Sequence, residues 1–142
     1  MSKDEGRILG IDYGSKRVGV AVSDPLRVIA QGVGTLDNDA MLMHRLGEII
    51  QERSVVLVVV GIPYAADGGT GAKAKEVEQF IAELRRVVSL NIETWDESYS
   101  SLNARRAFIE GGMKRKKRQE KRRIDEMAAR LLLQEYLENH DH

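Results

Sequence analysis

Apolar residues recur along this 142-residue chain at two spacings, the two-residue period of a strand and the 3.6-residue period of a helix. Apolar or alternating segments predict five strands, at residues 8–12, 17–22, 28–36, 55–61 and 90–95. The first two flank a Tyr-Gly-Ser-Lys turn, which predicts an antiparallel hairpin. The fourth has no polar alternation, as expected for a central strand that is covered on both faces.

Helical spacing of apolar residues fills the segments between and after these strands. It predicts helices at about residues 41–53, 72–88 and 124–137. Asp37 or Asn38 is expected to cap the first helix, and Ser100 or Ser101 a further short helix that ends at the paired glycines 111–112. No linker or repeat interrupts the order β-β-β-α-β-α-β-α-α, so we expect one α/β domain over residues 1–142.

Composition narrows the class of protein. A hydrophobic fraction of 42% and a charged fraction of 31% are typical of a soluble globular domain. The absence of cysteine excludes disulfides, thiolate nucleophiles and cysteine-ligated zinc, and fits a reducing compartment. Residues 1–7 contain no apolar stretch of signal-peptide length, and the longest apolar run, 55–60, is far shorter than a membrane span. We therefore expect a cytoplasmic protein with no membrane contact.

Charge is distributed unevenly although the 22 basic and 22 acidic residues give a formal net charge of zero. Residues 114–123 contain eight of the basic residues and one acidic residue, so the rest of the chain carries a net charge of −7. Such a stretch can bind phosphates in a protein that is neutral overall, although a solvated loop is the alternative interpretation. The candidate nucleic-acid contacts within it are Lys114, Arg115, Lys116, Lys117 and Arg118.

Three positions carry acids that could act together. Asp12 ends the first predicted strand, the pair Asp96-Glu97 ends the last one, and Asp125 shares a helix face with two alanines. Convergent carboxylates suit Mg²⁺ or Mn²⁺ and metal-assisted phosphodiester hydrolysis. Taken singly, each acid has another explanation: a turn residue, a surface acid, or an acid favoured by the dipole of the first helical turn.

Motifs in several blocks of the chain resemble those of the YqgF family, in the same order. They are residues 10–25 (GIDYGSKRVGVAVSDP), 59–71 (VVGIPYAADGGTG), 96–97 (DE), 124–129 (IDEMAA) and 132–137 (LLQEYL). The resemblance implies a ribonuclease H-like fold, with a mixed five-stranded sheet flanked by helices, related to RuvC-type Holliday junction resolvases. It also implies that Asp12, Glu97 and Asp125 are the catalytic, metal-binding acids, and that Lys16 and Arg17 match the basic pair that contacts phosphate.

One departure from the family pattern concerns the residue after Glu97. The family usually has arginine there, whereas this chain has Ser98. If that arginine positions phosphate, the grip on substrate is reduced, or a cation from the basic stretch 114–123 replaces it. The sequence leaves this question open.

The resemblance makes the leading hypothesis a Mg²⁺- or Mn²⁺-dependent endonuclease that matures the 5′ end of pre-16S ribosomal RNA. The alternatives are a resolvase of branched DNA and a non-catalytic nucleic-acid-binding or ribosome-assembly factor. An actin-like sugar kinase or ATPase is disfavoured, because such enzymes close two domains around nucleotide and we expect one. Monomer and homodimer both remain open.

Overall fold

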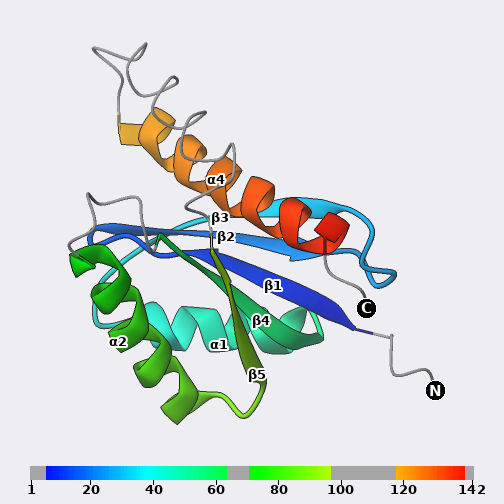
Figure 1. The fold of residues 1–142 in the computed structure, drawn as a ribbon, viewed down its shortest axis with the longest axis horizontal. Helices are drawn as coiled ribbons and strands as arrows, with labels where there is room; N and C mark the ends of the chain where they lie inside the picture. Colours follow the sequence, from blue (N-terminus) through cyan, green and yellow to red (C-terminus); the bar gives the residue numbers. More distant parts are fainter. Residues whose placement is uncertain (1–5, 64–70, 97–117, 140–142) are drawn as a thin grey trace.

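The computed structural model describes residues 6–63, 71–96 and 118–139 (Figure 1). Its strands are β1 (Arg7–Asp12), β2 (Arg17–Ser23), β3 (Ala30–Asp37), β4 (Val55–Ile62) and β5 (Asn91–Asp96). Its helices are α1 (Leu42–Glu52), α2 (Ala72–Val87) and α4 (Arg118–Asn139). The predicted short helix after residue 100 lies outside the described residues. In the ranges that are described, no helix is long and apolar enough to cross a membrane.

The strands form one five-stranded sheet in the order β3-β2-β1-β4-β5. Strand β2 is antiparallel to both β1 and β3, whereas β1, β4 and β5 run parallel. Helices α1 and α2 cover one face of the sheet and α4 crosses the other, as Figure 1 shows. The mixed five-stranded sheet flanked by helices is therefore confirmed.

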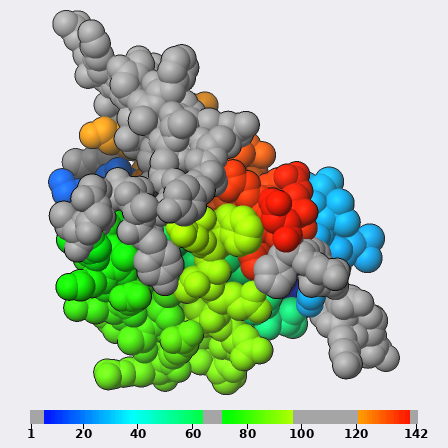
Figure 2. Space-filling model, in the orientation of Figure 1, coloured from blue at the N-terminus to red at the C-terminus, as the bar shows by residue number. Residues whose placement is uncertain are grey.

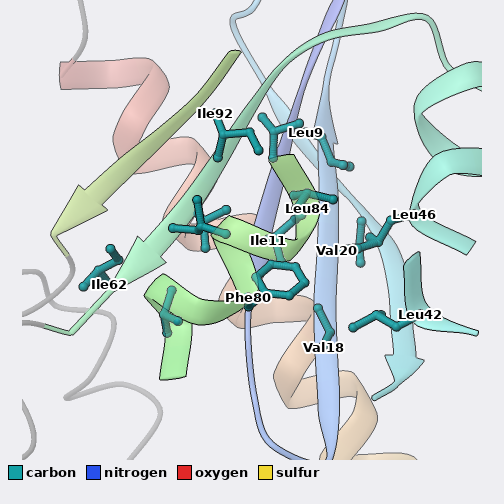
Figure 3. Packing of buried hydrophobic residues seen from close by; sticks show 14 of the residues in the cluster. Leu9, Ile11, Val18, Val20, Leu42, Leu46, Ile62, Phe80, Leu84 and Ile92 are labelled. Atoms are coloured by element: carbon teal, nitrogen blue, oxygen red, sulfur yellow. The ribbon is translucent and has the colours of Figure 1, made fainter. Parts of the chain in front are cut away.

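Alternation along the strands sends side chains to two separate cores. In β1, Leu9 and Ile11 pack with α1 and α2, as Figure 3 shows, whereas Ile8 packs with α4. In β4, Val58 and Val60 belong to the first core and Val59 to the second. Both faces of β4 are covered, which explains its lack of polar alternation and confirms it as a central strand.

Helix α4 begins six residues earlier than the apolar spacing predicts, at Arg118 instead of residue 124. The six added residues are all arginine, lysine, glutamine or glutamate, which favour helix without giving a periodic apolar signal. Asp125 consequently lies about two turns inside the helix and not in its first turn. The dipole of the helix N-terminus therefore does not explain an acid at this position.

Two smaller expectations are wrong for local reasons. The third strand begins at Ala30 and not at residue 28, because the backbone N–H groups of Val28 and Ile29 donate to Asp24 Oδ1 in the preceding turn. Neither Asp37 nor Asn38 caps α1. Asp37 belongs to β3, Asn38 donates to the Gly14 carbonyl, and the next residue, Asp39, accepts the N–H of Met41 through Oδ1.

The second half of α4 is attached to β5 by a hydrogen bond. Tyr136, which is 1% exposed, donates its hydroxyl to Glu93 Oε1 at 2.7 Å, and its ring packs edge-on against Trp95. Burial, and then the hydrogen bond to Glu93, raises the pKa of Tyr136, so the hydroxyl remains a donor at neutral pH. In Figure 2, β5 (yellow-green) lies between α2 (green) and the red end of α4.

We expect Tyr136→Phe to lower the free energy of unfolding by about 1–3 kcal/mol, because Glu93 loses its donor in a half-buried setting. Urea denaturation at pH 7 measures this change. Tyr13→Phe is the matched control, since the Tyr13 ring keeps its stacking contact with Phe80 in that variant. Equal stability of wild type and Tyr136→Phe would show that this bond does not hold α4 to the sheet.

Candidate functional site

Asp12 is the last residue of β1 and is only 6% exposed. Ile8 of the same strand packs against α4, and position 10 also faces α4, so the two-residue period of the strand places Asp12 on that face. Its register partner on β2 is Gly19. A buried carboxylate therefore lies at the carboxyl end of a central strand, under the first half of α4.

The backbone of α4 approaches the sheet closely beside Asp12. A Cβ atom on Gly19 would lie 2.0 Å from the backbone oxygen of Asp125, and one on Gly10 would lie 2.8 Å from Cβ of Leu133. Only glycine leaves room for the helix at these two positions. The glycine directly across from Asp12 is thus the one on which the Asp125 backbone rests, which brings the two acids to the same place on the sheet.

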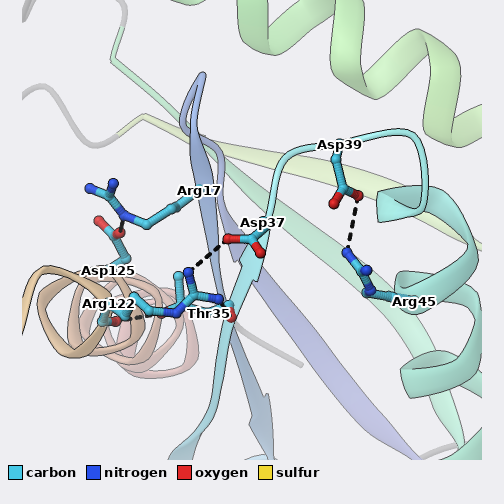
Figure 4. A network of polar contacts seen from close by, with 7 residues as sticks. All are labelled: Arg17, Thr35, Asp37, Asp39, Arg45, Arg122 and Asp125. Atoms are coloured by element: carbon cyan, nitrogen blue, oxygen red, sulfur yellow. Dashed lines mark hydrogen bonds and ion pairs between the residues drawn. The ribbon is translucent and has the colours of Figure 1, made fainter. Parts of the chain in front are cut away.

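Arg17, the first residue of β2, joins this pair of acids. Its Nε donates to Asp125 Oδ2 at 2.6 Å, and the two side chains are 27% and 17% exposed. Figure 4 shows the two terminal nitrogens of Arg17 on the side of the guanidinium away from Asp125. Residues 108 positions apart in the chain therefore form a half-buried, charge-assisted hydrogen bond on the face of the sheet that α4 covers.

The turn before Arg17 is held by the segment after β3. Asn38 donates its side-chain amide to the Gly14 carbonyl at 2.8 Å, and its backbone N–H to the Lys16 carbonyl at 2.9 Å. These bonds fix the start of β2 and with it Arg17. Lys16 lies in the turn itself and is exposed, as a phosphate contact requires.

The alternation of β5 decides the face on which Asp96, the first acid of the pair 96–97, lies. Glu93 and Trp95 contact α4, whereas Asp96 pairs with Ile62, which belongs to the core under α1 and α2. Asp96 therefore lies on the face opposite Asp12. Glu97 and Ser98 lie outside the described residues, so Glu97 stays a prediction.

Four of the five candidate nucleic-acid contacts in the basic stretch lie outside the described part of the chain. This applies to Lys114, Arg115, Lys116 and Lys117, while Arg118 is described only as the start of α4. Arg122, in the same stretch, serves a structural role. Its Nη1 binds Asp37 Oδ1 at 2.7 Å, its Nη2 donates to the Thr35 carbonyl at 3.0 Å, and its own carbonyl accepts the Thr35 hydroxyl (Figure 4).

A metal site can be assessed from the donors that the structure describes. Within residues 6–63, 71–96 and 118–139, no group of three or more acids or histidines is placed to hold a metal ion. Asp12 and Asp125 supply two carboxylates from two elements, and hard divalent cations prefer such oxygen ligands. The donor set is therefore compatible with Mg²⁺ or Mn²⁺, and Glu97 is the candidate third ligand outside the described residues.

The Arg17–Asp125 ion pair is the feature of this site that the sequence analysis missed. Both residues are named there, Arg17 as a phosphate contact and Asp125 as a metal ligand, but their mutual contact leaves no local spacing signal across 108 positions. The ring of Tyr13, the residue directly after Asp12, is stacked on Phe80 at 4.6 Å between centroids.

A family model and several full-length relatives match this chain. The family model described as RuvX, Holliday junction resolvase, matches residues 6–139. A protein of Chlorobaculum tepidum is 44% identical over 140 residues, which is 98% of each chain. One from Chlorobium luteolum is 45% identical over 137 residues, 96% of each chain, and both carry the name "Putative pre-16S rRNA nuclease".

Two solved structures share the fold at low sequence identity. Thermus thermophilus RuvC, solved with a Holliday junction substrate, aligns with a TM-score of 0.57 and 14% identity over 96% of this chain and 97% of that one. Fowlpox virus resolvase, solved with Holliday junction DNA, aligns with a TM-score of 0.51 and 12% identity over 93% and 97%. These resolvases have a ribonuclease H-like fold, which confirms the predicted fold class.

Proposed function

The chain belongs to the RuvX family of Holliday junction resolvases, the YqgF family that its motifs resemble, and from this premise we propose that it is a metal-dependent endonuclease. Its substrate is a ribosomal RNA precursor, and the reaction is hydrolysis that matures the 5′ end of pre-16S RNA. The names of the relatives from Chlorobaculum tepidum and Chlorobium luteolum favour this substrate. Such a reaction takes place in the cytoplasm, which is the proposed location.

The observation that carries the proposal is that the backbone of Asp125 rests on Gly19, the register partner of Asp12. Asp12 comes from the end of a central strand and Asp125 from a helix more than a hundred residues later, and both lie on the same face of the sheet. A buried or half-buried carboxylate is costly unless a cation or hydrogen-bond donors compensate its charge. Asp125 has such compensation from Arg17, and a divalent cation between the two acids would compensate their charge further, which favours ligand binding at this place.

Asp12, Asp125 and Glu97 are the residues that would hold the metal. When bound, Mg²⁺ or Mn²⁺ would activate water and stabilise the charge that develops on the phosphate. The chain's own residues provide the rest: Asp12 is fixed by its strand, and burial under α4 keeps bulk water from it. Lys16, exposed in the turn, would bind a phosphate near the scissile bond.

Branched DNA is the second candidate substrate. It is favoured by the description of the family model and by RuvC and the fowlpox resolvase, whose structures contain Holliday junctions. Neutralisation of phosphate and metal-assisted hydrolysis are common to both polymers. Recognition of the RNA 2′-hydroxyl separates them, and it requires an experiment.

The proposal is tested by cleavage of two labelled substrates, a pre-16S ribosomal RNA fragment and a four-way DNA junction. Each is incubated with the protein in Mg²⁺, Mn²⁺ or EDTA. We expect metal-dependent cleavage of the RNA, and cleavage of the junction alone would establish the second candidate. Salt-sensitive binding without cleavage of either substrate would instead indicate a non-catalytic binding or assembly factor.

The basic stretch has its own expected result. Alanine at all of residues 114–118 should weaken RNA binding and flatten its salt dependence, by about 0.7 in the slope of log K against log salt for each lost single-strand phosphate contact. Fluorescence anisotropy at several salt concentrations measures the slope. Lys75→Ala is the control for loss of an exposed lysine elsewhere. An unchanged slope would remove the stretch from the binding surface.

A further inference from the structure

The half-buried ion pair between Arg17 and Asp125 has a consequence for the metal site, on the premise of the proposed function. Arg17 Nε lies 2.6 Å from Asp125 Oδ2, which is the distance of a strong charge-assisted hydrogen bond. An oxygen that accepts this bond is also one that a divalent cation would use. A guanidinium and a dication repel each other, so each disfavours the other's close approach to the same carboxylate oxygen.

The position of Arg17 allows its guanidinium to move away from Asp125. It is the first residue of β2, directly after a turn, and its side chain is 27% exposed. Figure 4 shows its contact with Asp125 through Nε alone, with the two terminal nitrogens directed away. By contrast, Arg122 is attached through two terminal nitrogens to Asp37 and Thr35. Among the described residues, the guanidinium of Arg17 thus makes fewer hydrogen bonds than that of Arg122, one against two.

The negative charges of the site explain why a positively charged side chain that can move away, such as Arg17, stabilises the metal-free protein. Asp12 lies across from Gly19, on which the Asp125 backbone rests, so the two carboxylates are like charges on one face of the sheet and repel each other. The positive charge of Arg17 reduces that repulsion and holds the Asp125 side chain in place. A divalent cation provides the same compensation, so the two are alternatives at Oδ2.

We propose that Arg17 is an exchangeable counter-ion: it pairs with Asp125 in the metal-free protein, gives up that oxygen when a divalent cation binds, and turns its guanidinium toward the phosphates of the nucleic acid. Arg17 is thus a positioning residue for Asp125 and a competitor of the metal. Because binding linkage is reciprocal, a phosphate that binds Arg17 also favours binding of the cation.

The test is the affinity of the purified full-length protein for Mn²⁺, measured without nucleic acid by calorimetry. We expect Arg17→Gln to bind Mn²⁺ roughly 3-fold to 10-fold more tightly than wild type, because the competing ion pair is gone. In EDTA the same variant should melt at a lower temperature than wild type, and Mn²⁺ should raise its melting temperature by more. A residue with only a structural role would not increase metal affinity.

Two controls separate exchange from a general effect of charge. Lys16→Gln removes the neighbouring positive charge, and Arg45→Gln removes an arginine from the Arg45–Asp39 ion pair elsewhere on the surface. Each should change Mn²⁺ affinity less than about twofold, because exposed charges are screened. An increase in Lys16→Gln equal to that in Arg17→Gln would overturn the proposal.

Arg17→Lys, which keeps the charge, provides a second variant if Arg17→Gln does not fold, and its affinity for Mn²⁺ should lie between those of wild type and Arg17→Gln. Unchanged or weaker binding in the Arg17 variants, together with loss of binding in Asp125→Asn, would overturn the exchange while leaving the metal site in place. Mn²⁺ binding that survives in Asp125→Asn would instead overturn the site in the proposed function, and the exchange with it.

Discussion

Asp12→Asn and Asp125→Asn are each expected to reduce the cleavage rate at least about 100-fold, with the fold unchanged. Each substitution removes a charged ligand while conserving side-chain volume, and the metal contributes several kcal/mol of transition-state stabilisation. A loss of about 2.7 kcal/mol already corresponds to 100-fold. Single-turnover cleavage of the substrate identified above measures the rate, and thermal unfolding in EDTA verifies the fold.

Asp39→Asn is the matched control for these two variants. Asp39 also forms an ion pair with an arginine, Arg45, at 3.0 Å, but it lies on the surface before α1. Its substitution should leave the cleavage rate within about twofold, as expected for a surface change away from the reacting groups. Turnover at the wild-type rate in either Asp12→Asn or Asp125→Asn would sink the assignment of these acids as metal ligands.

Much of the fold was predictable because the strands and helices that pack into the two cores have apolar residues at the regular spacing of a strand or a helix. Strand β4 has apolar residues on both faces and was predicted as central, and α2 has the 3.6-residue spacing of a helix with one buried side. The start of α4 was not predictable in this way. Residues 118–123 include no apolar residue that could give a periodic signal, so their helical state depends on propensity and on the attachment of Arg122 to β3.

The candidate site was predictable only in part. The end of a strand and an inward helix face indicated Asp12 and Asp125, because both positions follow from local periodicity. Their meeting depends on how α4 crosses the sheet, which is set by contacts between distant segments. The pairing of Arg17 with Asp125 and the position of Asp96 on the opposite face depend on the same long-range arrangement. Local spacing contains no information about either.

Gly19→Ala is the second variant with a large expected effect, because it directly alters the place where α4 crosses the sheet. The added Cβ would lie 2.0 Å from the Asp125 backbone oxygen, which is backbone and cannot rotate away. Helix α4 must shift outward, so we expect the free energy of unfolding to fall by about 3 kcal/mol, the upper part of the range for overpacking. Urea denaturation measures this loss.

The same shift should also impair the site, since Asp125 moves with the helix while Asp12 remains on β1. We therefore expect Gly19→Ala to lose cleavage even under conditions in which it is folded. Gly47→Ala is the control: its Cβ meets no atom within 4 Å in α1, so it should stabilise the protein by about 0.5–1 kcal/mol and leave cleavage unchanged. If Gly19→Ala kept wild-type stability and cleavage, α4 would not rest on β2 as closely as the structure shows, and the meeting of the two acids would lose its physical basis.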